Sequence, residues 1–120
     1  MPIKSFHDLL VYKKAYELSL LIHSRTLKFP QYEQYEIARQ MRKASKSICA
    51  NLAEGYSKSN ASEIEFKRYI QIALGSSDEM LVWLDYSFSL NYIDEDEYNK
   101  FSESYKEISK MLQGLYKTWQ

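Results

Sequence analysis

Four cations in the first half of the sequence are the residues best suited to binding chemistry. They are Arg39, Arg42, Lys43 and Lys46. At this helical spacing they share one narrow arc, opposite an apolar stripe. Such a row can follow a phosphate backbone by charge alone, but it also suits a solvated face or the acidic surface of a neighbouring chain. The sequence predicts a basic surface for RNA, DNA or an acidic protein partner, with those alternatives open.

Histidine and cysteine, which often serve catalysis or metal binding, are few and scattered. A di-iron site in a helical bundle needs inward Glu residues and Glu-x-x-His pairs. His7 and His23 instead follow Lys4 and Leu20 at the third position. Cys49 is the single cysteine, so it has no internal disulfide partner, and with two distant His residues it cannot complete a zinc shell. We predict no metal site and a structural role for Cys49.

The other candidate groups have structural explanations. The acidic run at residues 94–97 lies where the free N–H groups of a helix start favour negative charge. Gly55, Gly75 and Gly114 are isolated from one another, so they form no glycine-rich phosphate loop. The sequence therefore predicts a protein without enzymatic activity, cofactor or small-molecule substrate.

Length and composition limit the elements that carry these residues. With 120 residues, 45% of them hydrophobic, we expect a single domain over residues 1–120. Three Gly and two Pro are too few for a β-sandwich and favour long helices. Because no apolar run is long enough to span a bilayer and no signal peptide is recognisable, we expect a cytoplasmic protein with no membrane contact.

Charge is unevenly divided, although the net charge is zero. Residues 1–58 carry ten Lys or Arg and five Asp or Glu, whereas residues 59–120 carry six and eleven. Such asymmetry can mark a nucleic-acid face. It can equally mark basic helices that lie against acidic ones, within one chain or between subunits.

Apolar periodicity and capping residues predict four helices. With their caps, these cover residues 8–28, 31–54, 62–90 and 94–119. Ser5, Ser62 and Asp94 begin capping patterns, and Gly55 is expected to end the second helix. Amphipathic segments of similar length with short connections predict an all-α, antiparallel up-down-up-down four-helix bundle.

Asn51 is a polar residue near the inward stripe of the second helix. That stripe consists of Ile37, Met41, Ala44, Ile48 and Leu52. Several small residues surround Asn51, so a neighbouring helix can approach closely. We predict that Asn51 is a hydrogen-bonding core residue that fixes packing register, rather than a ligand.

The third predicted helix has two apolar faces. Its inner face begins at Phe66, is centred on Ser77 and ends at Phe88. The far side carries Ile72, Gly75, Val82, Trp83, Tyr86 and Leu90. A monomeric bundle needs one such face, so the second predicts a protein contact. Extra Leu and Tyr residues on the first helix can complement it, which predicts a homo-oligomer.

The sequence also resembles a known family along nearly its whole length. The likeness is carried by residues 6–15 (FHDLLVYKKA), 29–30 (FP), 40–55 (QMRKASKSICANLAEG) and 66–79 (FKRYIQIALGSSDE). These stretches resemble the four-helix bundle proteins encoded within intervening sequences of bacterial 23S ribosomal RNA genes. The resemblance implies a bundle that assembles into a ring, a homopentamer in similar proteins. It also implies kinship with the accessory variability determinant proteins of diversity-generating retroelements, for which nucleic-acid and reverse-transcriptase binding are expected.

Two functions follow as hypotheses from the sequence. The leading one is a non-enzymatic homo-oligomeric scaffold whose basic face on the second helix binds RNA, DNA or an acidic protein. The alternative is a purely structural or protein–protein interaction module that does not contact nucleic acid.

Overall fold

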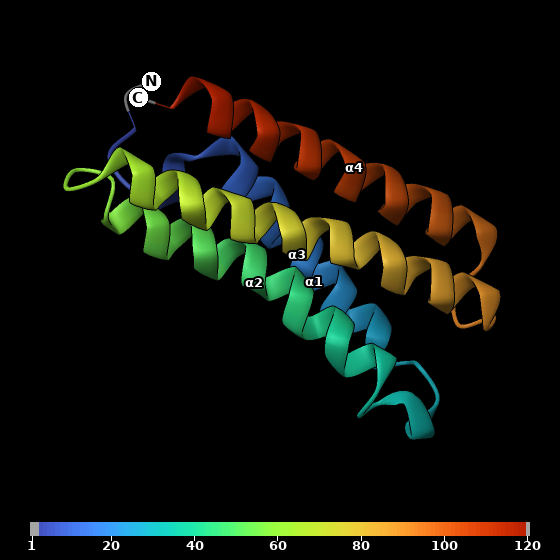
Figure 1. The fold of residues 1–120 in the computed structure, drawn as a ribbon. Helices are drawn as coiled ribbons and strands as arrows, with labels where there is room; N and C mark the ends of the chain where they lie inside the picture. Colours follow the sequence, from blue (N-terminus) through green and yellow to red (C-terminus); the bar gives the residue numbers. More distant parts are fainter. Residues whose placement is uncertain (1–2, 120) are drawn as a thin grey trace.

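The computed structural model describes residues 3–119, which form four α-helices and two short 3₁₀ helices. The α-helices are α1 (Leu10–Thr26), α2 (Ile37–Ser57), α3 (Glu63–Ser89) and α4 (Glu95–Thr118). They run alternately up and down along a molecule of 45 × 24 × 21 Å (Figure 1). The α2–α3 turn lies at one end of the bundle, and the α1–α2 and α3–α4 connections lie at the other. The predicted all-α four-helix bundle is confirmed.

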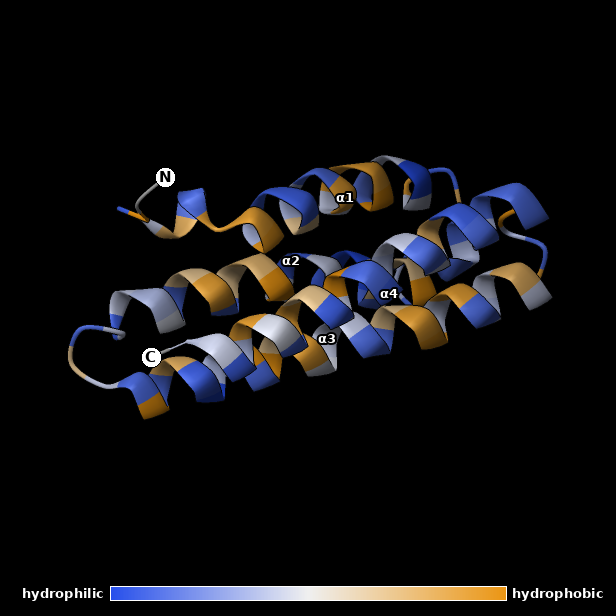
Figure 2. Ribbon diagram, turned by 90° about the horizontal axis from the view of Figure 1, so that it is seen from above, coloured by the Kyte–Doolittle hydropathy of each residue, from blue (hydrophilic) through white to orange (hydrophobic). Residues whose placement is uncertain are grey.

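Each helix contributes an apolar stripe to one core, and polar residues occupy the positions between (Figure 2). In α1 the stripe is Val11, Ala15, Leu18 and Ile22. Ser77 is fully buried at the centre of α3, where its hydroxyl donates to the Tyr105 carbonyl oxygen of α4 at 3.2 Å. Among residues 3–119, no helix combines the length and apolarity needed to cross a membrane.

The first helix begins later than the predicted residue 8. The capping box is present, but it closes a 3₁₀ helix, η1 (Phe6–Asp8), rather than α1. Asp8 accepts hydrogen bonds from the backbone N–H groups of Lys4 and Ser5, and these lower its carboxyl pKa. Leu9 then adopts an extended backbone and buries its side chain, which separates the two helices.

The second helix also begins later than predicted, at Ile37 rather than near residue 31. Residues 31–33 form a separate 3₁₀ helix, η2 (Gln31–Glu33). The side-chain amide of Gln34 donates to the carbonyl oxygens of Thr26 (2.9 Å) and Phe29 (3.0 Å), the last of them in the preceding loop. These bonds keep the connection compact without a continuous helix.

Gly55 does not end α2, contrary to the sequence prediction. The helix continues to Ser57, and no glycine has a positive φ among the described residues. A Cβ added at Gly55 would lie 2.5 Å from the Cβ of Tyr69 and 3.0 Å from Cδ1 of Phe66. The glycine is therefore needed for the close approach of α2 and α3.

The last two helices begin at their predicted caps. The Ser62 hydroxyl accepts from the N–H of Glu65, and Asp94 and Glu97 form a complete capping box. Phe88, however, does not belong to the inner face of α3, because it is 37% exposed and stacks on Tyr98 at 4.8 Å. The buried residue in that turn is Ser87.

The four seams between neighbouring helices are unequal. Backbone contacts are extensive between α2 and α3 and between α3 and α4, but sparse between α1 and α4. Two ion pairs bridge the sparse seam. Lys14 contacts Glu107 at 2.6 Å, and Arg25 contacts Glu97, with Nη2 and Oε1 3.1 Å apart.

Candidate functional site

The basic row lies on the outer side of α2, but Arg42 has a structural role. Its guanidinium donates to Thr26 Oγ1 at 3.1 Å and to the carbonyl oxygen of Gln34 at 3.2 Å. Arg42 thus ties the end of α1 to the connection before α2. The sequence predicted that all four cations share one side of the second helix, and α2 does place them there. Arg42, however, uses its guanidinium for these bonds within the fold.

The other three cations remain at the surface. Lys46 Nζ lies 2.8 Å from Nδ1 of His23, and because an ammonium group only donates, Nδ1 must accept. Arg39 and Lys43 are exposed, and neither forms an ion pair with another residue in the described range 3–119. The row therefore presents uncompensated positive charge.

An apolar line runs beside this row on α1. Tyr16 and Leu20 of α1, and Leu27 just after its end, are each about half exposed on the side that borders α2. Leu27 and Arg39 line the same open cleft, of about 590 Å³, at the α1–α2 connection. We call this combined area the hairpin surface; it consists of Tyr16, Leu20, Leu27, Arg39, Lys43 and Lys46.

The predicted second face of α3 is also uncovered. Ile72, Val82, Tyr86 and Leu90 are between 44% and 53% exposed. Gly75 is exposed with no heavy atom near its missing Cβ, and Trp83 is half-buried. We call this area the α3 stripe; it consists of Ile72, Gly75, Val82, Trp83, Tyr86 and Leu90.

From residue 69 to residue 90, the charged residues of α3 beside the α3 stripe are all acidic, whereas Arg68 lies one turn before Ile72. Between residues 69 and 90 the chain has no Lys or Arg, whereas Asp78, Glu79 and Asp85 are all exposed. Each carboxylate is held in place by a donor: Ser109 Oγ for Asp78 (2.8 Å), Trp83 Nε1 for Glu79 (2.8 Å) and the Tyr98 hydroxyl for Asp85 (2.6 Å). The C-terminal part of the stripe, beside residues 78–85, thus has a fixed negative border.

Asn51 lies half-buried on the side of α2 that faces α3. Its amide nitrogen donates to the carbonyl oxygen of Ser47 at 2.8 Å and to Ser47 Oγ at 3.0 Å. That hydroxyl contacts Ser76 Oγ of α3, also at 3.0 Å. Asn51 therefore reaches α3 through Ser47 rather than directly.

The scattered His and Cys residues do not come together. His7 stacks on Phe6 with ring centroids 4.0 Å apart, whereas His23 faces Lys46. Burial raises the pKa of the Cys49 thiol to about 11, so little reactive thiolate forms at neutral pH. Within residues 3–119, no three His, Cys, Asp or Glu side chains are grouped to hold a metal ion.

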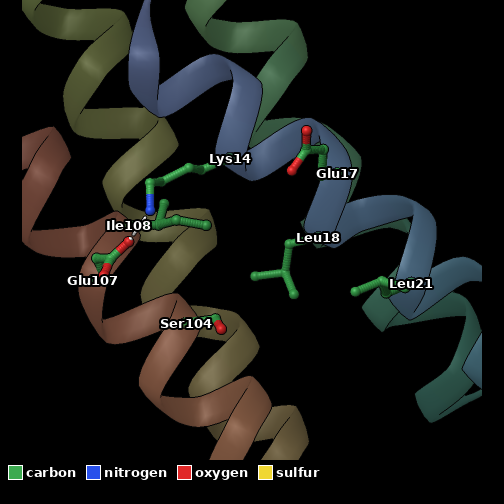
Figure 3. Close-up of a pocket in the computed structure, with 7 residues that line it drawn as sticks. All are labelled: Lys14, Glu17, Leu18, Leu21, Ser104, Glu107 and Ile108. Carbon is green, nitrogen blue, oxygen red and sulfur yellow. Dashed lines mark hydrogen bonds and ion pairs between the residues drawn. The ribbon is translucent and has the colours of Figure 1, made fainter.

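Sequence reasoning missed one feature, a cleft of about 190 Å³ on the sparse α1–α4 seam. Leu18 and Leu21 point from α1 toward α4, and the Lys14–Glu107 pair lies at one side (Figure 3). The extra apolar positions of α1 were the available signal. Which of these residues lie beside α2 and which lie beside α4 depends on how the helices pack, and the sequence pattern does not reveal that.

Comparisons with known proteins agree with this fold. The search of curated proteins found no match. A crystal structure of a protein of unknown function from the S23 ribosomal protein family of Bacteroides thetaiotaomicron is similar, with a TM-score of 0.82 and 24% identity, over 91% of this chain and 96% of that one. The pattern of a family described as "23S rRNA-intervening sequence protein" matches residues 7–114. The chain therefore belongs to the 23S rRNA-intervening sequence protein family.

Proposed function

We propose that this protein is a non-enzymatic scaffold that works by assembling with copies of itself. The observation that supports the proposal is the α3 stripe, an aromatic and aliphatic surface that none of the other residues in the range 3–119 covers. Surfaces of this composition with a charged border are typical of protein–protein contacts. Neither the family nor the structural neighbour is named for an enzymatic activity.

Light scattering on a sizing column tests the proposal. At micromolar concentration we expect a particle several times the 14.3 kDa of one chain. Val82→Glu should reduce it to a monomer, because a carboxylate at the centre of the α3 stripe cannot be desolvated cheaply. Asn99→Glu adds the same charge at an exposed α4 position and should leave the assembly intact. A wild-type monomer of 14.3 kDa would contradict self-assembly.

Nucleic-acid binding is the second candidate function, supported by the uncompensated charge of Arg39 and Lys43. If they contact phosphates, binding of a labelled structured RNA should weaken steeply with salt, since each contact releases counterions. Arg39→Gln with Lys43→Gln should lower both affinity and salt slope without disturbing the Arg42 bonds. Lys106→Gln with Lys110→Gln, on exposed α4 positions, is the matched control. Wild-type protein that fails to bind at low salt rules this function out.

A further inference from the structure

The hairpin surface combines an apolar line with positive charge. Two contacts place the line and the basic row side by side: His23 of α1 meets Lys46 of α2, and Leu27 shares a cleft with Arg39. A phosphate backbone requires the cations but has no use for three half-exposed apolar side chains beside them. The surface is better suited to a partner that is both apolar and acidic.

The α3 stripe has the complementary composition. Its exposed apolar residues are accompanied by Glu79 and Asp85, which lie on either side of Val82 around the helix. The spacing matches as well: Arg39 and Lys46 are seven residues apart, as are Asp78 and Asp85. Each span is therefore two helical turns, about 10 Å.

We propose that the α3 stripe of one copy docks against the hairpin surface of a second copy, so that the basic row of α2 faces the acidic border of α3. This inference rests on the proposed self-assembly and specifies which surfaces meet. Charge decides against the symmetric alternatives. Pairing the 78–85 segments of two α3 helices would place carboxylates opposite carboxylates, and pairing two hairpin surfaces would place cations opposite cations, which is unfavourable in both cases. The contact is therefore head to tail.

Reciprocal charge reversal tests the docking. The first variant combines Arg39→Glu with Lys43→Glu, and the second combines Glu79→Lys with Asp85→Lys. Each should lower the assembled mass, because like charges then face each other. A chain that carries all four substitutions should assemble again, because the reversed charges of its two surfaces then match. Asn99→Glu is the control for added charge outside both surfaces, and circular dichroism melts check that every variant folds.

Neutral substitutions guard against loss of folding. Arg39→Gln with Lys43→Gln, and Glu79→Gln with Asp85→Asn, should weaken assembly less than the reversals while keeping polar side chains at each site. If wild type assembles but neither reversal changes its mass, the docking is wrong while self-assembly stands. If both reversals dissociate the protein and the four-substitution chain stays dissociated, charge matching is wrong. Loss of RNA binding in the Arg39 and Lys43 variants with an unchanged mass assigns the row to nucleic acid and overturns the inference.

Discussion

Gly55 and Gly114 both lie inside helices, yet their surroundings predict opposite effects of adding a methyl group. At Gly55 the new Cβ would lie 2.5 Å from Tyr69 Cβ, whereas Gly114 has no heavy atom within 4 Å. We expect Gly55→Ala to lower the free energy of unfolding by about 1–3 kcal/mol. Gly114→Ala should raise it by about 0.5–1 kcal/mol, because alanine is the better helix former. Urea denaturation measures both, and equal stability of the two variants would disprove the close approach of α2 and α3.

Glu97 joins two elements, because it completes the α4 capping box and pairs with Arg25 of α1. The hydrogen bond from Arg25 lowers the pKa of this carboxyl below its ordinary 4.5. A carboxyl with a depressed folded-state pKa stabilises the fold above its unfolded pKa and loses that contribution as pH falls through the folded value. We therefore expect unfolding free energy to decline below pH 4.5, and less steeply in Arg25→Gln. A Lys14→Gln control, at the other ion pair, should decline more nearly like wild type; identical pH profiles for all three would refute the role of Arg25.

At the scale of elements, Asp94 determines where α4 begins. Its carboxylate accepts the N–H of Glu97 at 2.8 Å, while Glu97 Oε1 accepts the N–H of Asp94 at 3.2 Å. Loss of such a cap typically costs 0.5–2 kcal/mol, so we expect Asp94→Ala to lower the unfolding free energy by about 1 kcal/mol. Asp96→Ala removes a carboxylate from the same turn without a capping bond and should cost only a few tenths of a kcal/mol. Thermal melts compare them, and equal melting temperatures would argue against the cap.

The sequence predicted the type of each element because the apolar periodicity is strong. It did not predict three helix boundaries, which are the start of α1 and the two ends of α2. The capping box at Ser5 closes η1 because Leu9 turns inward, and that depends on the core rather than on local residues. Judged from its neighbours in the sequence, Gly55 indicates a helix end. In the structure a glycine is needed there because Tyr69 of α3 packs against it. The late start of α2 depends on Gln34, whose amide bonds reach carbonyl groups up to eight residues earlier.

The candidate site was predictable to a similar degree. Helical spacing alone places Ile72, Val82 and Tyr86 on one exposed arc of α3, because that face is opposite the core stripe. The same spacing put Arg42 in the basic row but carries no information on its bonds to Thr26 and Gln34. Those bonds depend on the tertiary arrangement that brings Thr26, at the end of α1, and Gln34, in the α1–α2 connection, close to Arg42.

At the scale of the whole molecule, the proposed head-to-tail docking would use two different surfaces of each copy. Such contacts either close into a ring or continue into a filament, depending on the rotation between copies. We expect a closed ring, as the sequence resemblance implies, and therefore one discrete mass across a tenfold range of protein concentration. Sedimentation velocity measures this directly. A mass that keeps rising with concentration would show an open filament instead.

The sparse seam between α1 and α4 also has a consequence for how the molecule opens. Because α2, α3 and α4 are joined by the two most extensive seams, they form one cooperative unit, while α1 is attached mainly through α2. Partial openings in native proteins follow such divisions. Release of α1 would expose Ile22 and Leu18 without unfolding the other three helices. Its backbone amides should therefore exchange hydrogen for deuterium sooner than those at the centre of α3. At high protein concentration we expect a released α1 to be the element that two copies can exchange, because swapping an identical element costs little once that element has opened.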